Sequence, residues 1–243
     1  MNLLSDRPAD PLFLSVTLIL CAIAGVATSA WCIHIDDVIN NDGVEYIRAA
    51  EQFAARNWAG AFAVHQWPFF SFLMWGTSVV LGTSYEVAGQ LLNTSFFTAS
   101  SLLFVGVVRA FGGTSRRLTI LAALVAVLHP AFNEYRAFII RDAGYLAFYL
   151  LALLYLARSL QAPAGRYPAA VLVALLVASL FRVEGVVFLL SAPLLILTVR
   201  GESSGSPWTR LALTVLSAAV LALVLGWRLI APNGGVSAEV SAS

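Results

Sequence analysis

Long apolar runs alternate with short polar segments along most of the chain. A membrane-spanning helix needs roughly 20 apolar residues, and seven runs approach or meet this length. They cover residues 11–33, 87–108, 118–132, 143–157, 168–181, 185–199 and 211–230. This pattern predicts an all-α integral membrane protein with about seven transmembrane helices in residues 1–231. The Gly-, Ser- and Ala-rich tail, 232–243, is predicted to be disordered.

A further apolar stretch, residues 66–81, decides the orientation of every span after it. If this stretch crossed the membrane, Arg116, Arg117 and Arg200 would lie on the side that holds most of the acidic residues. Basic residues concentrate in cytoplasmic loops, which favours the other arrangement. We therefore expect a Trp- and Phe-rich helix lying flat in the outer interface, within a long first outer loop at 34–86. The N-terminus is then cytoplasmic.

The segment before that stretch predicts a second non-spanning helix, over residues 42–56. Its apolar residues recur at helical spacing on one face, and charged residues occupy the other face. Such a pattern is typical of an amphipathic helix that lies against a membrane. The apolar set comprises Tyr46, Ile47, Ala50, Phe53 and Ala54.

Composition agrees with the membrane assignment. The chain of 243 residues is 60% hydrophobic and 11% charged, and its mean hydropathy is +0.85, whereas soluble domains are about one quarter charged. The net charge of +1 gives no reason to expect nucleic acid as a partner. Cys21 and Cys32 would lie almost on opposite sides of one helix, which disfavours a disulfide or a metal site.

Polar residues form four groups that the predicted topology places on the outer face. Carboxylates there could act as a general base, and arginines could bind the phosphate of a lipid-linked donor. Acidic groups beside a span are functional-site hypotheses by default. The groups are Asp36, Asp37 and Asp42; His65; Arg136, Arg141 and Asp142; and Arg182 with Glu184.

Each group also has a structural interpretation. Asp36 and Asp37 could be solvated loop carboxylates, and Asp42 could be the N-cap of a helix starting at Gly43. Asp142 could cap the span that it opens, and Arg136 could anchor in the headgroup region. Arg182 and Glu184 could form a local ion pair in a turn, and His65 could be an interfacial residue.

Three motifs resemble the N-terminal half of the GT-C superfamily of membrane glycosyltransferases, in the branch of protein O-mannosyltransferases and aminoarabinose transferases. The first is Asp42-Gly43-Val44-Glu45-Tyr46, followed by Ala49-Ala50. The second is Trp67-Pro68-Phe69-Phe70 running to Leu81-Gly82, with Phe69 where the family has a second proline. The third is Arg141-Asp142 opening a span. The chain has the size of the family's shared N-terminal module, so the resemblance implies a minimal member, a protein that needs a partner subunit, or one with a further C-terminal region.

This resemblance implies an inverting transferase that moves a sugar from a polyprenyl-phosphate donor to a lipid, glycan or protein acceptor at the outer face. Asp42 would be the base, with Asp36 or Asp37 as runner-up, and Asp142 would be a second acidic site residue. Arg141, Arg136 and Arg182 would bind the donor phosphate, beside Tyr46, His65 and Glu184. No cofactor is certain, although Mg²⁺ or Mn²⁺ could bind the carboxylates, and a bacterial inner membrane is the expected location. A non-catalytic membrane subunit and a transporter of lipids or lipid-linked sugars remain as alternatives.

Overall fold

The computed structural model describes residues 7–36, 38–161 and 166–200, and every element in these ranges is an α-helix. Within these ranges three helices, α1 (Pro11–Ile35), α5 (Tyr85–Ala110) and α8 (Asp142–Gln161), are long and apolar enough to cross a membrane, which indicates a membrane protein. The predicted span 211–230 and the tail 232–243 lie outside the described residues. The elements are α1 (Pro11–Ile35), α2 (Asn41–Ala54), α3 (Trp58–Val64), α4 (Phe69–Leu81), α5 (Tyr85–Ala110), α6 (Arg116–Leu128), α7 (Pro130–Glu134), α8 (Asp142–Gln161), α9 (Arg166–Phe181) and α10 (Glu184–Arg200).

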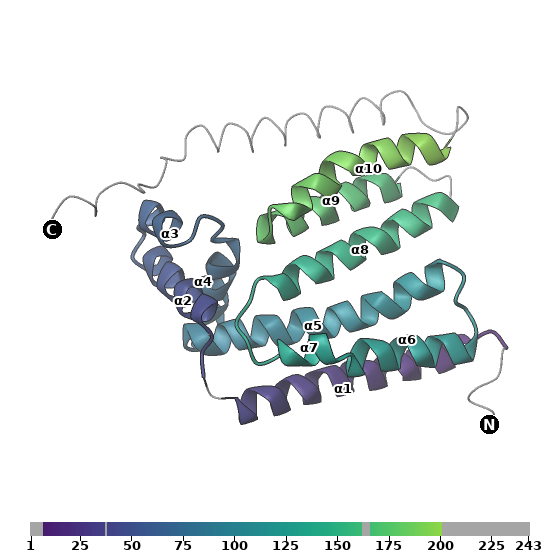
Figure 1. Cartoon of the computed structure of the whole chain (residues 1–243), viewed down its shortest axis with the longest axis horizontal. Helices are drawn as coiled ribbons and strands as arrows, with labels where there is room; N and C mark the ends of the chain where they lie inside the picture. Colours follow the sequence, from purple (N-terminus) through teal and green to yellow (C-terminus); the bar gives the residue numbers. More distant parts are fainter. Residues whose placement is uncertain (1–6, 37, 162–165, 201–243) are drawn as a thin grey trace, which may run out of the picture.

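The helices divide into a bundle and a cap. Helices α1, α5, α6, α8, α9 and α10 run side by side, whereas α2, α3 and α4 gather at one end of them (Figure 1). We call these three helices, residues 41–81, the cap. Helix α4 corresponds to the predicted stretch 66–81 and is not one of the bundle helices. It ends at Gly82, which adopts the left-handed conformation (φ 66°) that glycine tolerates best.

Helix α2 confirms the predicted amphipathic helix, but its apolar face packs against a different partner from the one predicted. Tyr46, Ala50 and Phe53 are buried, as the periodicity predicts, whereas Ala54 is exposed. The buried face packs against Phe70 and Met74 of α4, together with residues of the bundle. The apolar face of α2 therefore contacts protein, where the sequence predicted contact with the membrane, because α4 covers it.

Helix α6 is much shorter than the helix beside it. Its 13 residues span about 20 Å, whereas the 25 residues of α1 span about 37 Å. The predicted span 118–132 is interrupted at His129-Pro130, since proline disfavours helical backbone at the residue before it. The five-residue α7 and the non-helical segment 135–141 then continue along α1 toward the cap (Figure 1).

Side chains of other elements bind the backbone of the segment 135–141. Asn40 Nδ2 donates to Ile139 O at 3.3 Å, and Ile139 N donates to Asn40 Oδ1 at 2.9 Å. Asn93, fully buried within α5, donates to Phe138 O. Irregular backbone at membrane depth is tolerated only where protein or a cavity surrounds it. These two asparagines thus supply hydrogen bonds that helical backbone would have made internally.

The opposite end of the bundle joins the N-terminal segment to the start of α6. Ala9 N donates to Thr114 O at 2.8 Å, and Arg116 N donates to Arg7 O at 3.0 Å. Asp10 caps α1 by accepting from Phe13 N at 2.8 Å, and it also pairs with the Arg116 side chain. Arginines at this end thus contrast with the acidic residues of the cap end.

Candidate functional site

Charged side chains from separate segments gather where the cap meets the bundle. Asp42 and Glu45 lie on α2, and His65 follows α3. Arg141 and Asp142 lie at the start of α8, and Arg182 and Glu184 lie in the turn from α9 to α10. These starts and ends of helices are at the same end of the bundle (Figure 1). We call the set Asp42, Glu45, His65, Arg141, Asp142, Arg182 and Glu184 the polar cluster.

His65 connects the cap to the start of α8. Arg141 Nη1 lies 3.0 Å from His65 Nε2. Since a guanidinium can only donate, His65 Nε2 accepts and the neutral ring carries its proton on Nδ1. Nδ1 lies 3.6 Å from Glu45 Oε2. Burial, and then the charge of Arg141, lower the pKa of His65, although Glu45 and Asp42 oppose this shift.

We expect acidification from pH 7.5 to 5.5 to lower the Tm of the protein by a few degrees through His65. An unfolded histidine binds a proton near pH 6.5, whereas folded His65 has a lowered pKa and resists protonation. Stability rises with pH wherever the unfolded state binds more protons, so this contribution is present above the unfolded pKa and is lost as the pH falls through the folded one.

The substitution His65→Gln should flatten the dependence of Tm on pH. His34→Gln, in the exposed last turn of α1, should keep the wild-type slope. If Tm depends on pH equally in wild type and in His65→Gln, protonation of His65 is not the cause.

Arg182 holds two carboxylates together. Its Nη1 pairs with Asp142, forty residues earlier, and its Nη2 lies 2.6 Å from Glu184 Oε1. The bond to Glu184, more than any other contact, raises the pKa of Arg182, and the same bond lowers the pKa of the Glu184 carboxyl to about 2. The local pair expected between Arg182 and Glu184 is therefore present, and it extends to the first residue of α8.

Tyr46 lies beneath the polar cluster rather than on its surface. Its side chain is 2% exposed, and its ring meets His65 edge-on at 5.0 Å between centroids. Burial raises the pKa of Tyr46 to about 12; the charge of Arg141 opposes the shift, and those of Asp42, Asp142 and Glu45 add to it. Charges of α2 and of the start of α8 thus act on one hydroxyl, and the Tyr46 ring packs against His65.

Asp42 is accessible in the first turn of α2. This helix begins at Asn41 with Asn40 as its N-cap residue, so the alternative that Asp42 is the N-cap is wrong. The side chain of Asn40 bonds Ile139 instead of the α2 backbone. Asp42 is exposed, and within the described ranges no hydrogen bond or ion pair engages its carboxylate. A negative charge in this position interacts favourably with the helix dipole.

Two predicted site residues lie outside the polar cluster, and a third is not described. Asp36 is the residue after α1, and its carboxylate accepts from Val38 N at 3.4 Å. Asp37 is not among the described residues. Arg136 is 1% exposed and points into the bundle, so it neither joins the polar cluster nor anchors at the surface.

Aromatic residues pack at the interface between the cap and the bundle. Trp67 Nε1 donates to Ser179 O at 2.8 Å, which ties the start of α4 to the end of α9. Phe181 contacts Phe69, Phe96 and Phe148 with ring centroids 5.0, 5.3 and 5.9 Å apart. Arg182 follows Phe181 directly, so this packing sets the position of its guanidinium.

No three His, Cys, Asp or Glu side chains gather in a metal-binding group within the described ranges. Asp142 and Glu184 bond Arg182 instead. No family model, curated protein or solved structure matches the chain.

Three further polar residues make contacts that the sequence did not predict. Glu45, named above only as part of the motif around Asp42, faces His65. Asn40 and Asn93 bind the segment 135–141 and were not singled out. For Asn93 a signal was available, because an amide inside an apolar span needs a buried partner.

Proposed function

We propose that this protein is a multi-pass membrane glycosyltransferase that transfers a sugar from a polyprenyl-phosphate donor to an acceptor at the outer face. The observation that carries the proposal is the convergence of cap acids, His65 and two arginines at one end of an apolar bundle. These segments are far apart in sequence, so a local turn or cap does not explain their meeting. The resemblance of the motifs around Asp42, Pro68 and Asp142 to GT-C transferases supplies the reaction class.

In this mechanism Asp42 removes the proton from the acceptor hydroxyl or amine as that atom bonds the anomeric carbon. The bond from the anomeric carbon to the phosphate oxygen breaks, and its electron pair remains on polyprenyl phosphate. A single in-line displacement inverts the anomeric configuration.

Arg141 is the best candidate for binding the leaving phosphate. Its Nη1 contacts His65, while Nε and Nη2 form no hydrogen bond to described residues. Phosphate recognition favours a guanidinium with adjacent free donors, and charge stabilisation at the leaving group accelerates transfer. Arg182 already bonds two carboxylates and positions Asp142 beside Arg141.

The charge distribution supports an outward-facing cap. Arg109 lies in the last turn of α5 and Arg116 begins α6, both at the end opposite the cap, and Arg158 lies in the last turn of α8. Basic residues concentrate on the cytoplasmic side, so this end and the N-terminus are cytoplasmic and the polar cluster is periplasmic. A bacterial inner membrane fits this arrangement.

A transporter of lipids or lipid-linked sugars is the second candidate. The observation that favours it is Arg136, a buried cation beside an apolar cavity within the bundle. A transporter would move such a lipid between leaflets without cleaving it.

We expect the purified protein in nanodiscs to release polyprenyl phosphate from at least one member of a panel of synthetic polyprenyl-phosphate sugars. Release is measured by mass spectrometry with simple glycosides, a lipid A analogue or peptides as acceptors, and with Mg²⁺, Mn²⁺ or EDTA present. Empty nanodiscs are the control. If no donor is cleaved, while vesicles containing the protein flip a fluorescent polyprenyl-phosphate sugar, the protein is a transporter and the transferase proposal fails.

A further inference from the structure

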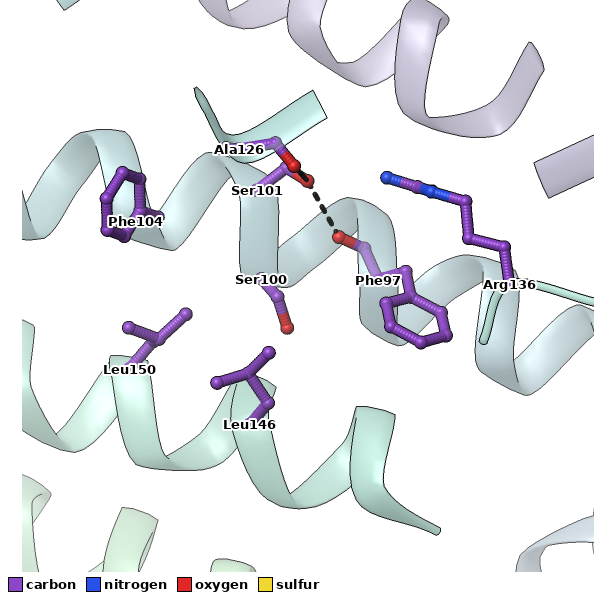
Figure 2. A pocket seen from close by; sticks show the side chains of 8 residues that line it. All are labelled: Phe97, Ser100, Ser101, Phe104, Ala126, Arg136, Leu146 and Leu150. Atoms are coloured by element: carbon purple, nitrogen blue, oxygen red, sulfur yellow. Dashed lines mark hydrogen bonds between the residues drawn. The ribbon is translucent and has the colours of Figure 1, made fainter. Parts of the chain in front are cut away.

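A cavity of about 190 Å³ lies between α5, α6 and α8, and none of its lining residues belongs to the polar cluster (Figure 2). Its walls are mostly apolar side chains, including Phe97 and Phe104 of α5, Ala126 of α6 and Leu150 of α8. The groups with polar atoms at its wall are Arg136 and two serines, Ser100 and Ser101. A partly open apolar space with one cation at its wall is suited to an amphipathic ligand.

Arg136 is almost completely buried yet has an unused nitrogen. Its Nε donates to Asn133 Oδ1 at 2.8 Å. Its Nη1 donates to Gly25 O at 3.0 Å and to Ser29 Oγ at 2.9 Å, and its guanidinium lies over the Phe97 ring. Among the described residues, Nη2 has no hydrogen-bond partner and no carboxylate pairs with this side chain. Figure 2 shows the guanidinium directed toward the wall formed by Ser101 and Ala126.

Arg136 lies at a depth in the bundle where a charge without a counter-ion is costly. Gly25 and Ser29 precede the end of α1 at Ile35 by ten and six residues, or about 15 and 9 Å of helix. At that depth an unpaired charge and an unsatisfied donor are both costly. Ser100 Oγ, at the same cavity, also lacks a partner within the described part of the chain. Two unsatisfied polar atoms among the described residues therefore lie buried at the wall of one apolar space.

We propose that this cavity binds an amphipathic carboxylate, such as a fatty acid, with its carboxylate on Arg136 Nη2 and its chain along α5. The free donors are one guanidinium nitrogen and one hydroxyl, which match the small carboxylate better than a phosphate that needs several donors. An apolar cavity of about 150 Å³ accommodates benzene, so 190 Å³ holds a chain of roughly eight carbons. The site is separate from the polar cluster and does not depend on the transferase reaction.

The test uses the full-length protein in a neutral detergent, with octanoate, octanol and octyl phosphate as probes. We expect octanoate to raise the Tm by roughly 5 °C at 100 times its Kd, and octanol, which lacks the charge, to raise it much less. If a native acid already occupies the cavity, solvent extraction should instead yield about one equivalent of fatty acid for each protein.

Two substitutions on adjacent residues of α6 provide the matched comparison. Ala126→Leu fills the cavity and should abolish both the octanoate shift and the extractable acid. Val125→Leu, on the exposed side of α6, should behave as wild type. Arg136→Gln should also abolish the octanoate shift, but Ala126→Leu decides the question if Arg136→Gln does not fold.

Four outcomes would overturn the proposal. Octanol could shift the Tm as much as octanoate, which would leave Arg136 without a role. Octyl phosphate could shift it more, which would assign a phosphate ligand. Ala126→Leu could retain the wild-type response, which would place binding outside the cavity. Wild type could show neither a shift nor an extractable acid.

Discussion

Asp42→Asn should reduce donor cleavage at least 100-fold, since a positioned general base contributes about 10²–10⁴-fold. Asparagine keeps the shape of the side chain and removes its ability to take a proton. The Tm should change little, because Asp42 is exposed and is not the N-cap of α2. Release of polyprenyl phosphate in nanodiscs measures the effect, with the best donor of the panel at saturating concentration.

The matched control is Glu51→Gln, the same change of charge on an exposed residue of α2 two and a half turns away. It should retain nearly full activity. Asp36→Asn tests the runner-up base. Full activity of Asp42→Asn, with loss of activity in Asp36→Asn, would move the base to the end of α1 and contradict the role given to the polar cluster.

Gly185→Ala should lower the Tm by about 5–10 °C, which corresponds to the roughly 2–3 kcal/mol that overpacking costs. A Cβ at Gly185 would lie 2.7 Å from both the Cα and the backbone N of Ser179. Backbone atoms cannot rotate aside, so α9 and α10 would have to separate. Because Gly185 follows Glu184 directly, the contact of Arg182 with Asp142 should weaken and donor cleavage should fall as well.

Gly76→Ala in α4 is the control for the change from glycine to alanine. A Cβ at Gly76 meets no atom within 4 Å. Alanine is favoured over glycine inside a helix by about 0.5–1 kcal/mol, so this variant should be as stable as wild type or slightly more so. Thermal unfolding in one detergent compares the two variants. Equal Tm values for Gly185→Ala and Gly76→Ala would show that α10 tolerates separation from α9.

Most helices were predictable because their signals are local. The run 87–108 lies within α5, and the periodic segment 42–56 closely matches α2. Apolar length and a repeat of 3.6 residues depend only on neighbours along the chain. The shortness of α6 was also readable, since His129-Pro130 marks its end.

The polar residues were less predictable. The sequence indicated Asp42, Asp142, Arg182 and Glu184 as site candidates, and the structure places all four in one cluster. It could not show that Glu45 faces His65, because a helix that ends in a loop does not define the direction of the following chain. Arg136 was placed among the surface arginines, since a lone arginine near a span end is usually interfacial.

The sequence by itself determined that this is an apolar, all-helical protein with a cap-forming loop between its first two long helices, because hydrophobic length and periodicity are properties of contiguous residues. Only the tertiary structure decided which charges meet. Arg182 reaches Asp142 across 40 residues, and Arg136 reaches Ser29 across 107. Such contacts depend on how α1, α5, α8 and α9 pack, and no local pattern specifies this packing. The same packing leaves the Asp42 carboxylate exposed at the cap and buries the Arg136 cation inside the bundle.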